Sequence, residues 1–189
     1  MILLSKYIES KITVDQAMLQ DIVDCFIIKK YKQNDTIVRV GQFVNEYFFI
    51  AEGSIRIVLE TEEKDITAWL IFENNFFTDL ESIKTGQGSK SKIVALEDTT
   101  LCLIHTSKMH QMYKKYPEWQ EFGRLITEDA LLNIIDTLVS FQVMDAQERY
   151  IRLLHKSDVI QRVPLKLLAS YLGITPTSLS RIRKSVSTI

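Results

Sequence analysis

Apolar positions follow a helical period near both ends of the chain and a strand-like period in its middle. Residues 1–30 are predicted to be helical, because an apolar side chain returns at every fourth position from Val14 to Phe26. Residues 36–105 instead carry short runs of β-branched and aromatic residues separated by glycine, asparagine and charged turns. About six strands, spaced by about ten residues, are typical of an all-β sandwich or barrel. The N-terminal stripe consists of Val14, Met18, Ile22 and Phe26.

Within the β region, turn residues separate six segments that we expect to be strands. The charged turn over residues 60–65 is expected to be a solvated hairpin tip. Side chains alternate most clearly just before that turn, with Ile55, Ile57 and Leu59 on one face and Ser54, Arg56 and Val58 on the other. The expected strands are 36–41, 46–53, 54–61, 66–72, 91–98 and 100–105.

A helical period returns after His105, breaks at Pro117 and then runs from Trp119 to about Val143. Its apolar residues cover more than one face, and a helix that is apolar on most sides is buried on most sides. A central core helix would explain this pattern. We favour a helix with one face on its own β-domain and the other on the same helix of a second copy. The residues are Leu125, Ile126, Ala130, Leu131, Leu132, Ile134, Ile135, Leu138, Val139 and Phe141.

The stretch from Leu165 to Lys184 has the pattern of a helix-turn-helix. Gly173 stands where a first helix must end in a residue tolerant of positive φ. Thr175 can cap the second helix, and Pro176 fits its first position. Upstream, Asp145 and Glu148 have the spacing of a capping box for a helix that runs to about His155. The small residue at the helix crossing is Ala169, and the apolar core is Leu168, Leu172, Ile174, Leu179 and Ile182.

An ordinary helical hairpin has the same spacing, and the charge distribution decides between the two interpretations. From Arg149 to the C-terminus there are eight basic residues and one acid, Asp158, so this segment carries +7. The whole chain has a formal charge of −1, so residues 1–148 carry −8. A basic end on an otherwise acidic chain favours a nucleic-acid module joined to a domain of another kind.

Composition excludes several classes of protein. The chain has 189 residues, enough for one or two domains with a sizeable core, and no apolar run approaches the roughly 20 residues that span a bilayer. The N-terminus lacks a basic n-region, so we expect no signal peptide, no membrane and a cytoplasmic protein. Cys25 and Cys102 are expected to be reduced and buried. Scattered histidines and the absence of a nucleophile–histidine–carboxylate grouping predict no catalytic residues, no metal site and no enzyme.

The chain resembles the Crp/Fnr superfamily of transcription regulators in three segments that occur in the family's order. They are residues 37–42, 47–57 and 76–95, with Gly41 and Gly53 at the turns of the jelly roll. The resemblance implies an α+β fold. We expect a cyclic-nucleotide-binding-like jelly roll with flanking helices over 1–116, a dimerisation helix over 117–144 and a helix-turn-helix domain over 145–189. That domain would be winged-helix-like with a reduced wing, because residues 156–163 are too few for an ample hairpin.

The resemblance also places an effector site, where the chain departs from the family. Members that bind cyclic AMP open their phosphate cassette with glycine and glutamate, and close it with arginine and serine. Here the first pair is Thr78 and Asp79, followed by Leu80, and the second pair is Lys90 and Ser91. Lysine cannot reproduce a bidentate arginine contact. The positions that should meet the adenine are Ile134 and Ile135, which cannot form hydrogen bonds.

These changes predict that cyclic AMP is not bound tightly and that no cofactor is needed. A different small-molecule effector, no effector at all, or a pocket filled by side chains all remain open. The candidate effector residues are Thr78, Asp79, Leu80, Lys90, Ser91, Ile134 and Ile135.

The recognition helix is expected to span about residues 176–185. Thr177, Ser178 and Arg181 are the candidates for base edges, because the first turns of such a helix face the groove floor. Arg181 matches an arginine of the family and can pair with guanine. Thr177 stands where well-known members carry glutamate, so their operators do not transfer. Phosphate contacts are expected from Lys166, Thr175, Ser180, Arg183 and Lys184; a solvated C-terminal turn is the alternative for Arg183 and Lys184.

The sequence therefore predicts a homodimeric regulator that binds double-stranded DNA at a palindromic operator, and that contacts RNA polymerase if it activates. The alternative is a sensor of the same fold whose helical tail binds a protein partner instead of DNA.

Overall fold

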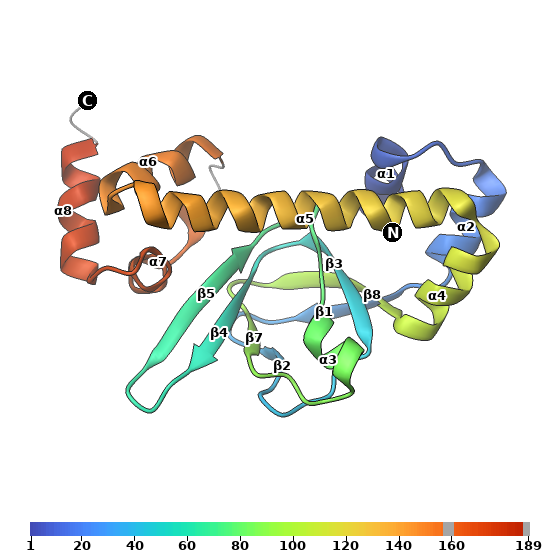
Figure 1. The fold of residues 1–189 in the computed structure, drawn as a ribbon, viewed down its shortest axis with the longest axis horizontal. Coiled ribbons are helices and arrows are strands. Elements are labelled where there is room, and N and C mark those ends of the chain that lie inside the picture. The colour runs from blue at the N-terminus through green and yellow to red at the C-terminus, as the bar shows by residue number, and fades with distance from the viewer. Residues whose placement is uncertain (157–160, 187–189) are drawn as a thin grey trace.

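The computed structural model describes residues 1–156 and 161–186, and Figure 1 shows their arrangement around one long helix. This helix, α5 (Pro117–Val143), runs along the length of the molecule above a β-roll. The helices α1 (Ile2–Lys11), α2 (Gln16–Val23) and α4 (Thr106–Lys115) gather at one end of α5. The helices α6 (Ala146–Lys156), α7 (Leu165–Leu172) and α8 (Pro176–Val186) gather at the other end.

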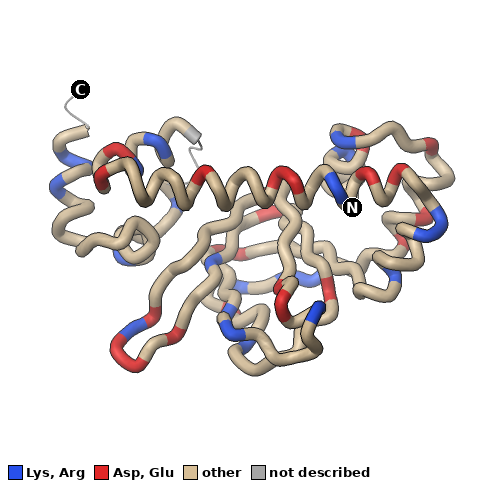
Figure 2. Tube along the Cα trace, in the orientation of Figure 1, with Lys and Arg blue, Asp and Glu red and all other residues tan. Residues whose placement is uncertain are grey.

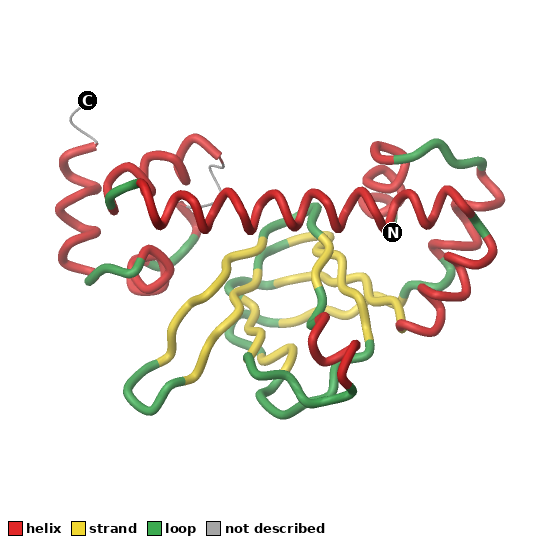
Figure 3. The backbone as a smooth tube through the Cα atoms, in the orientation of Figure 1, coloured by secondary structure: helices red, strands yellow, loops and turns green. Residues whose placement is uncertain are grey.

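The β-roll consists of two four-stranded antiparallel sheets, and the strands are shown in yellow in Figure 3. One sheet has the order β1-β8-β3-β6 and the other has the order β2-β7-β4-β5. A short helix, α3 (Leu80–Thr85), joins β6 to β7. The strands are β1 (Ile27–Tyr31), β2 (Thr36–Val38), β3 (Glu46–Glu52), β4 (Ile55–Glu60), β5 (Asp65–Ile71), β6 (Phe76–Phe77), β7 (Lys92–Ala95) and β8 (Thr99–His105).

All six expected strands are present, and the α+β class is confirmed. The prediction of a helical segment over residues 1–30 is wrong in two places. The chain breaks before α2, where the Asp15 side chain accepts a hydrogen bond from the Met18 amide and starts a new helix. After α2 the chain enters β1, whose paired isoleucines favour a strand. Phe26, the last residue of the apolar stripe, is buried beyond the end of α2.

Alternation along β3 and β8 explains why these strands have continuous apolar sequences. Phe48 and Ile50 point between the two sheets, whereas Phe49 and Ala51 point toward the helices. In β8, Leu101 and Leu103 point between the two sheets, and Cys102 and Ile104 point toward the helices. Because both faces of this sheet are covered, neither strand has a polar side.

The alternation expected in β4 holds only in part. Ile55 is fully buried between the sheets, and Ile57 packs against the same core. Leu59 is 44% exposed, because it lies next to the hairpin turn, beyond the core that Ile55 occupies. Val58, expected on the face of Arg56, is fully buried, and the pairing of β4 with β5 shifts register between Ile57 and Val58.

The first half of α5 belongs to the core of its own chain, and the second half does not. Trp119 and Phe122 are fully buried and stack with ring centroids 4.4 Å apart. Beyond Thr127, α5 carries a row of exposed apolar residues, which we call the α5 seam. The seam consists of Leu131, Leu132, Ile134, Ile135, Leu138, Val139, Phe141 and Val143, each between 41% and 69% exposed.

Two further expectations concern the burial of the cysteines and the presence of membrane-spanning helices. Cys102 is buried as expected, but Cys25 is only partly buried, because it follows α2 at the edge of the helical core. None of the helices in the described ranges is long and apolar enough to cross a membrane.

Candidate DNA-binding surface and effector region

The turn between α7 and α8 has the geometry that the sequence predicts. Gly173 adopts φ +72°, and its amide donates to the carbonyl oxygen of Ser170 at the end of α7. The Thr175 hydroxyl accepts from the Ser178 amide at 3.1 Å and so caps α8, which begins at Pro176. The two helices enclose a small apolar core. Leu168, Ala169, Leu172 and Leu179 are buried in it, and Ile174 and Ile182 pack against it.

One face of α8 is exposed and polar, and we call it the α8 face. It consists of Thr177, Ser178, Arg181, Lys184 and Ser185, at spacings of three and four along the helix. Leu179 points the opposite way, into the helix-turn-helix core. The three residues expected to reach base edges therefore share one solvent-facing surface.

The residues expected to contact phosphates differ in how exposed they are. Lys166 in α7 and Lys184 in α8 are exposed, whereas Ser180 is partly buried. The Thr175 hydroxyl is already engaged with Ser178. Arg183 is partly buried, and its guanidinium lies over the ring of Tyr150, 5.8 Å from the centroid.

Three of the basic residues counted in the sequence are used in contacts inside the chain. Arg149 donates to the carbonyl oxygens of Met144 and Leu172, the latter at 3.2 Å. Arg152 pairs with Asp136 of α5, and Arg162 pairs with Glu73 at 2.7 Å. The positive charge that can meet DNA is therefore smaller than +7. Figure 2 shows basic positions along α8 and acidic positions at the tip of the β4–β5 hairpin.

The helix α6 connects the end of α5 to the helix-turn-helix, and α7 also contacts α5. Asp145 and Glu148 form the expected capping box, with reciprocal bonds of 2.8 Å from each amide to the other side chain. Tyr171 of α7 packs edge-on against Phe141 of α5, and burial raises the pKa of its phenol above the ordinary value. Residues 157–160, which make up half of the segment where a reduced wing is expected, lie outside the described residues.

The effector cassette residues form contacts within the roll. The Thr78 hydroxyl donates to the Glu46 carbonyl oxygen at 2.8 Å, and Asp79 caps α3 by accepting from the Ser82 amide at 2.9 Å. Lys90 pairs with Glu81 at the surface. Both contacts of Asp79 and Lys90 are local, and the Lys90–Glu81 pair is exposed, with 71% and 53% of the two side chains accessible.

The remaining effector candidates lie on different elements of the fold. Leu80 is 53% exposed at the start of α3, and Ser91 is partly buried with its carbonyl oxygen bonded to the Ser89 hydroxyl at 2.8 Å. Ile134 and Ile135 are 48% and 47% exposed and belong to the α5 seam.

A family sequence model and several solved structures match this chain. Residues 28–116 match the sequence model of the cyclic nucleotide-binding domain family. FixK2 from Bradyrhizobium japonicum superposes with a TM-score of 0.74 at 15% identity, covering 86% of this chain and 85% of that one. CLP from Xanthomonas campestris, described as a c-di-GMP responsive global regulator, gives 0.71 at 15% identity and 92% coverage of both chains.

A third solved structure has a similar fold. A mutant of CooA from Carboxydothermus hydrogenoformans gives a TM-score of 0.70 at 16% identity, covering 88% of this chain and 78% of that one. The chain has the fold of the Crp/Fnr regulators. No curated protein sequence matches it significantly.

The Crp/Fnr resemblance inferred from three short segments is thereby confirmed, and the matched domain begins at β1. Within the described part of the chain, no group of three or more histidine, cysteine or acidic side chains could hold a metal ion.

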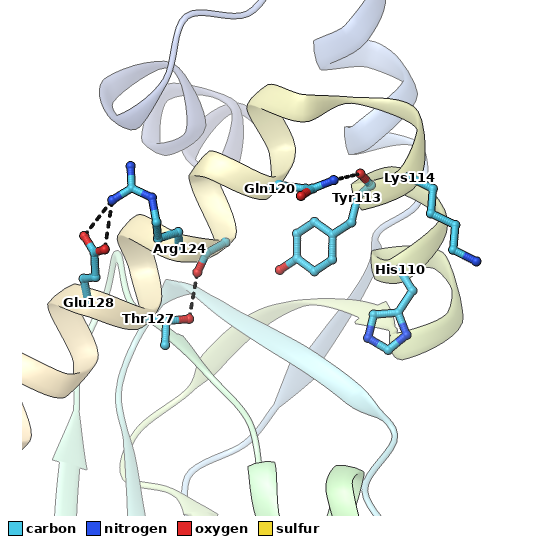
Figure 4. A pocket seen from close by; sticks show the side chains of 8 residues that line it. His110, Tyr113, Lys114, Gln120, Arg124, Thr127 and Glu128 are labelled. Atoms are coloured by element: carbon cyan, nitrogen blue, oxygen red, sulfur yellow. Dashed lines mark hydrogen bonds and ion pairs between the residues drawn. The ribbon is translucent and has the colours of Figure 1, made fainter.

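Surface cavities lie beside the helices at one end of α5. The first lies between α4 and α5 and has a volume of about 600 Å³ (Figure 4). Arg124 at its rim is paired with Glu128 at 2.8 Å, and Gln120 donates to the Tyr113 carbonyl oxygen at 2.7 Å. Burial raises the pKa of the Tyr113 phenol well above its ordinary value. The second cavity lies between α1 and α2.

Proposed function

We propose that this chain is a DNA-binding transcription regulator that works as a homodimer in the cytoplasm. The observation that carries the proposal is the exposed α8 face, held by a helix-turn-helix whose turn, cap and core are all formed. A helix presented in this way fits the major groove of DNA. We assign residues 1–116 to an effector-sensing roll, 117–144 to dimerisation and 145–189 to DNA binding.

Within the α8 face, Arg181 is assigned to guanine, since a guanidinium can donate to O6 and N7 together. Thr177 and Ser178 are assigned to neighbouring base edges, since they lie one turn closer to the start of α8. Phosphate contacts are assigned to Lys166, Thr175, Ser180, Arg183 and Lys184, because cationic and hydroxyl side chains at the rim of the motif position the helix without reading sequence.

The α5 seam supports dimerisation with a second copy. Soluble monomers rarely expose a contiguous apolar row of this length, so a covering surface is expected. Leu131, Ile135 and Leu138 follow one another at spacings of four and three, which is the repeat of a coiled-coil interface. A two-fold axis across α5 would cover the seam of each copy with that of the other and would present two α8 helices to two half-sites of a palindromic operator.

Cyclic AMP is not the effector in this proposal. Asp79 and Lys90 are occupied by contacts to α3 residues, and Ile134 and Ile135 offer an adenine no hydrogen bond. A small-molecule effector of another kind, acting on the same roll, stays part of the proposal. If the protein activates transcription, RNA polymerase is its further partner.

The experiment that tests DNA binding is a mobility-shift assay with genomic fragments at two salt concentrations. We expect salt-sensitive binding that leaves a sequence-selective remainder at the higher concentration. A second candidate function is a sensor whose helical tail binds a protein. It is favoured because three arginines of this tail form hydrogen bonds or ion pairs within the chain. Absence of binding even at low salt would support this second candidate.

A further inference from the structure

The cavity between α4 and the first half of α5 lies at the opposite end of α5 from α8 (Figures 1 and 4). We call it the α4–α5 cavity. Its lining residues all belong to these two helices, so no residue of the cassette takes part. Its volume of about 600 Å³ is in the range of about 300–1,000 Å³ that is typical of small-molecule sites. The size therefore allows a small ligand, and the lining groups indicate its chemistry.

The Tyr113 side chain reaches from α4 into the α4–α5 cavity (Figure 4). Its carbonyl oxygen accepts from Gln120, but its hydroxyl forms no hydrogen bond with any of the described residues. Burial raises the pKa of this phenol well above its ordinary value, so the hydroxyl stays protonated at neutral pH and can donate. A partly buried tyrosine hydroxyl usually has a partner, because its lost hydration is otherwise uncompensated. A ligand with an acceptor oxygen would supply that partner.

A glycine inside α5 allows the Tyr113 ring to lie where it does. Gly123 is buried in the interior of α5, where glycine is less favourable than alanine. A Cβ at this position would overlap the Tyr113 hydroxyl oxygen and would lie 2.8 Å from two carbons of its ring. The phenol ring therefore lies against bare backbone of α5, and the His110 ring lies beside it with centroids 6.3 Å apart. These flat surfaces suit a planar apolar group.

The charges at the α4–α5 cavity favour a ligand with one negative charge. Lys114 is exposed at the rim, and among the described residues it has no ion-pair partner. Arg124, on the α5 side, is already paired with both carboxylate oxygens of Glu128, at 2.8 and 3.0 Å. One uncompensated cation matches a carboxylate, whereas a phosphate dianion would require a second cation. Lys114 also shares one face of α4 with His110, four residues before it, so both can face the same ligand group.

We propose that the α4–α5 cavity binds a small aromatic carboxylate. Its ring would lie against Tyr113 and the Gly123 backbone, and its carboxylate would accept from the Tyr113 hydroxyl and the Lys114 ammonium. Burial of the ring and the charge-assisted hydrogen bond supply the affinity, and the donors at one end fix the orientation of the ligand. The site is separate from the roll cassette, and the proposal does not depend on DNA binding.

Titration of benzoate into the ¹⁵N-labelled wild-type chain, followed by amide chemical shifts, tests the site. We expect saturable shifts at the Tyr113 and Gly123 amides with a Kd of about 1 mM, which is typical of a ligand of about ten non-hydrogen atoms. Benzamide has the same ring without the charge, and cyclohexanecarboxylate has the same charge without the planar ring. Both should bind at least about three-fold more weakly than benzoate, because each lacks one of the two contacts.

Three variants test the assigned residues. Tyr113→Phe removes only the hydroxyl and should weaken benzoate binding at least about three-fold. Lys114→Gln should weaken it about two- to five-fold, as expected for an exposed charge pair. Lys108→Gln removes the same charge from an exposed position of α4 that does not line the cavity, so it should bind benzoate as the wild type does. The dispersion of each amide spectrum shows whether the variant is folded.

Three results would overturn the proposal. The first is the absence of saturable shifts at the Tyr113 and Gly123 amides at benzoate concentrations well above the expected Kd. The second is binding of benzamide or cyclohexanecarboxylate as tight as that of benzoate. The third is equal weakening by Lys114→Gln and Lys108→Gln, which would reduce the effect to net charge. Because no DNA enters the experiment, its failure would leave the proposed DNA-binding function standing, and a chain that binds no DNA could still show this site.

Discussion

The ring of Tyr171 in α7 meets the ring of Phe141 in α5 edge-on, with centroids 6.4 Å apart and an interplanar angle of 86°. The guanidinium of Arg149 lies over the same Phe141 ring, 4.6 Å from its centroid. One side chain near the end of the proposed dimer helix therefore contacts both α6 and α7. This contact joins the α5 seam to the helix-turn-helix.

Phe141→Ala should loosen this junction. The edge-on pair is worth about 0.5–1.5 kcal/mol and the cation–π contact about 0.5–1 kcal/mol, so the variant should lose about 1–2.5 kcal/mol of unfolding free energy. Urea denaturation measures the change. Because Phe141 also belongs to the seam, the variant should be compared in a Leu138→Glu background, where dimerisation does not contribute. Gln142→Ala, one residue along the same helix and exposed, is the control and should change stability by less than about 0.5 kcal/mol.

Leu138→Glu should convert the protein from a dimer to a monomer. Leu138 is 58% exposed in the single chain, and a dimer would bury it beside its counterpart, where a carboxylate would have to be desolvated. Sedimentation velocity at micromolar concentration measures the mass. Gln147→Glu adds the same charge to an exposed position of α6 and should leave the dimer intact. A monomeric wild type under these conditions would contradict the proposed seam.

Arg181→Ala should relax sequence preference, because the proposed guanine contact contributes roughly 1–3 kcal/mol of discrimination. Lys184→Ala should weaken binding to all sequences and lower the slope of log K against log salt by about 1. Selection of bound duplexes from random DNA, followed by salt titration, measures both effects. Lys64→Ala at the hairpin tip is the control for loss of one positive charge. An unchanged operator preference in Arg181→Ala would remove its assignment as a reading residue.

Cyclic AMP and cyclic GMP should show no micromolar binding by calorimetry. The expected reason is that Asp79 caps α3 and Lys90 pairs with Glu81, so that binding would have to break both contacts. Lys90→Arg supplies a bidentate cation but leaves Thr78 and the two isoleucines of α5 unchanged, and should not restore binding. Micromolar affinity of the wild-type chain for either nucleotide would contradict this part of the proposal.

Gly53→Ala should destabilise the roll more than Gly41→Ala does. Both glycines have positive φ, +85° and +79°, so alanine strains the backbone at each by roughly 1–2 kcal/mol. At Gly53 a Cβ would also lie 2.6 Å from the Asp98 carbonyl oxygen, whereas at Gly41 it would meet nothing within 4 Å. We expect losses of about 2–4 kcal/mol and about 1 kcal/mol respectively, measured by urea denaturation. Equal losses would show that the close backbone approach at Gly53 is relieved by local movement.

The sequence predicts the conformation correctly wherever residues close together along the chain decide it. The positive φ of Gly173, the cap at Thr175 and the capping box of Asp145 and Glu148 all depend on residues within one turn of one another. For the same reason the six expected strands were found. The prediction of one helical segment over residues 1–30 is wrong because Val14 and Phe26 continue the four-residue spacing of α2 beyond both of its ends.

The sequence by itself determined the order of the elements, the helix-turn-helix and the departure of the cassette from the pattern that binds cyclic AMP. Only the tertiary structure decided how the charged residues are used. Arg149, Arg152 and Arg162 counted toward a basic DNA-binding segment, yet each forms a hydrogen bond or ion pair with a group of its own chain. The partners of Arg152 and Arg162, Asp136 and Glu73, lie 16 and 89 positions away along the chain, a separation that spacing within a motif does not encode. Formal charge depends on composition alone, whereas the charge available to a partner depends on which side chains the fold has already paired.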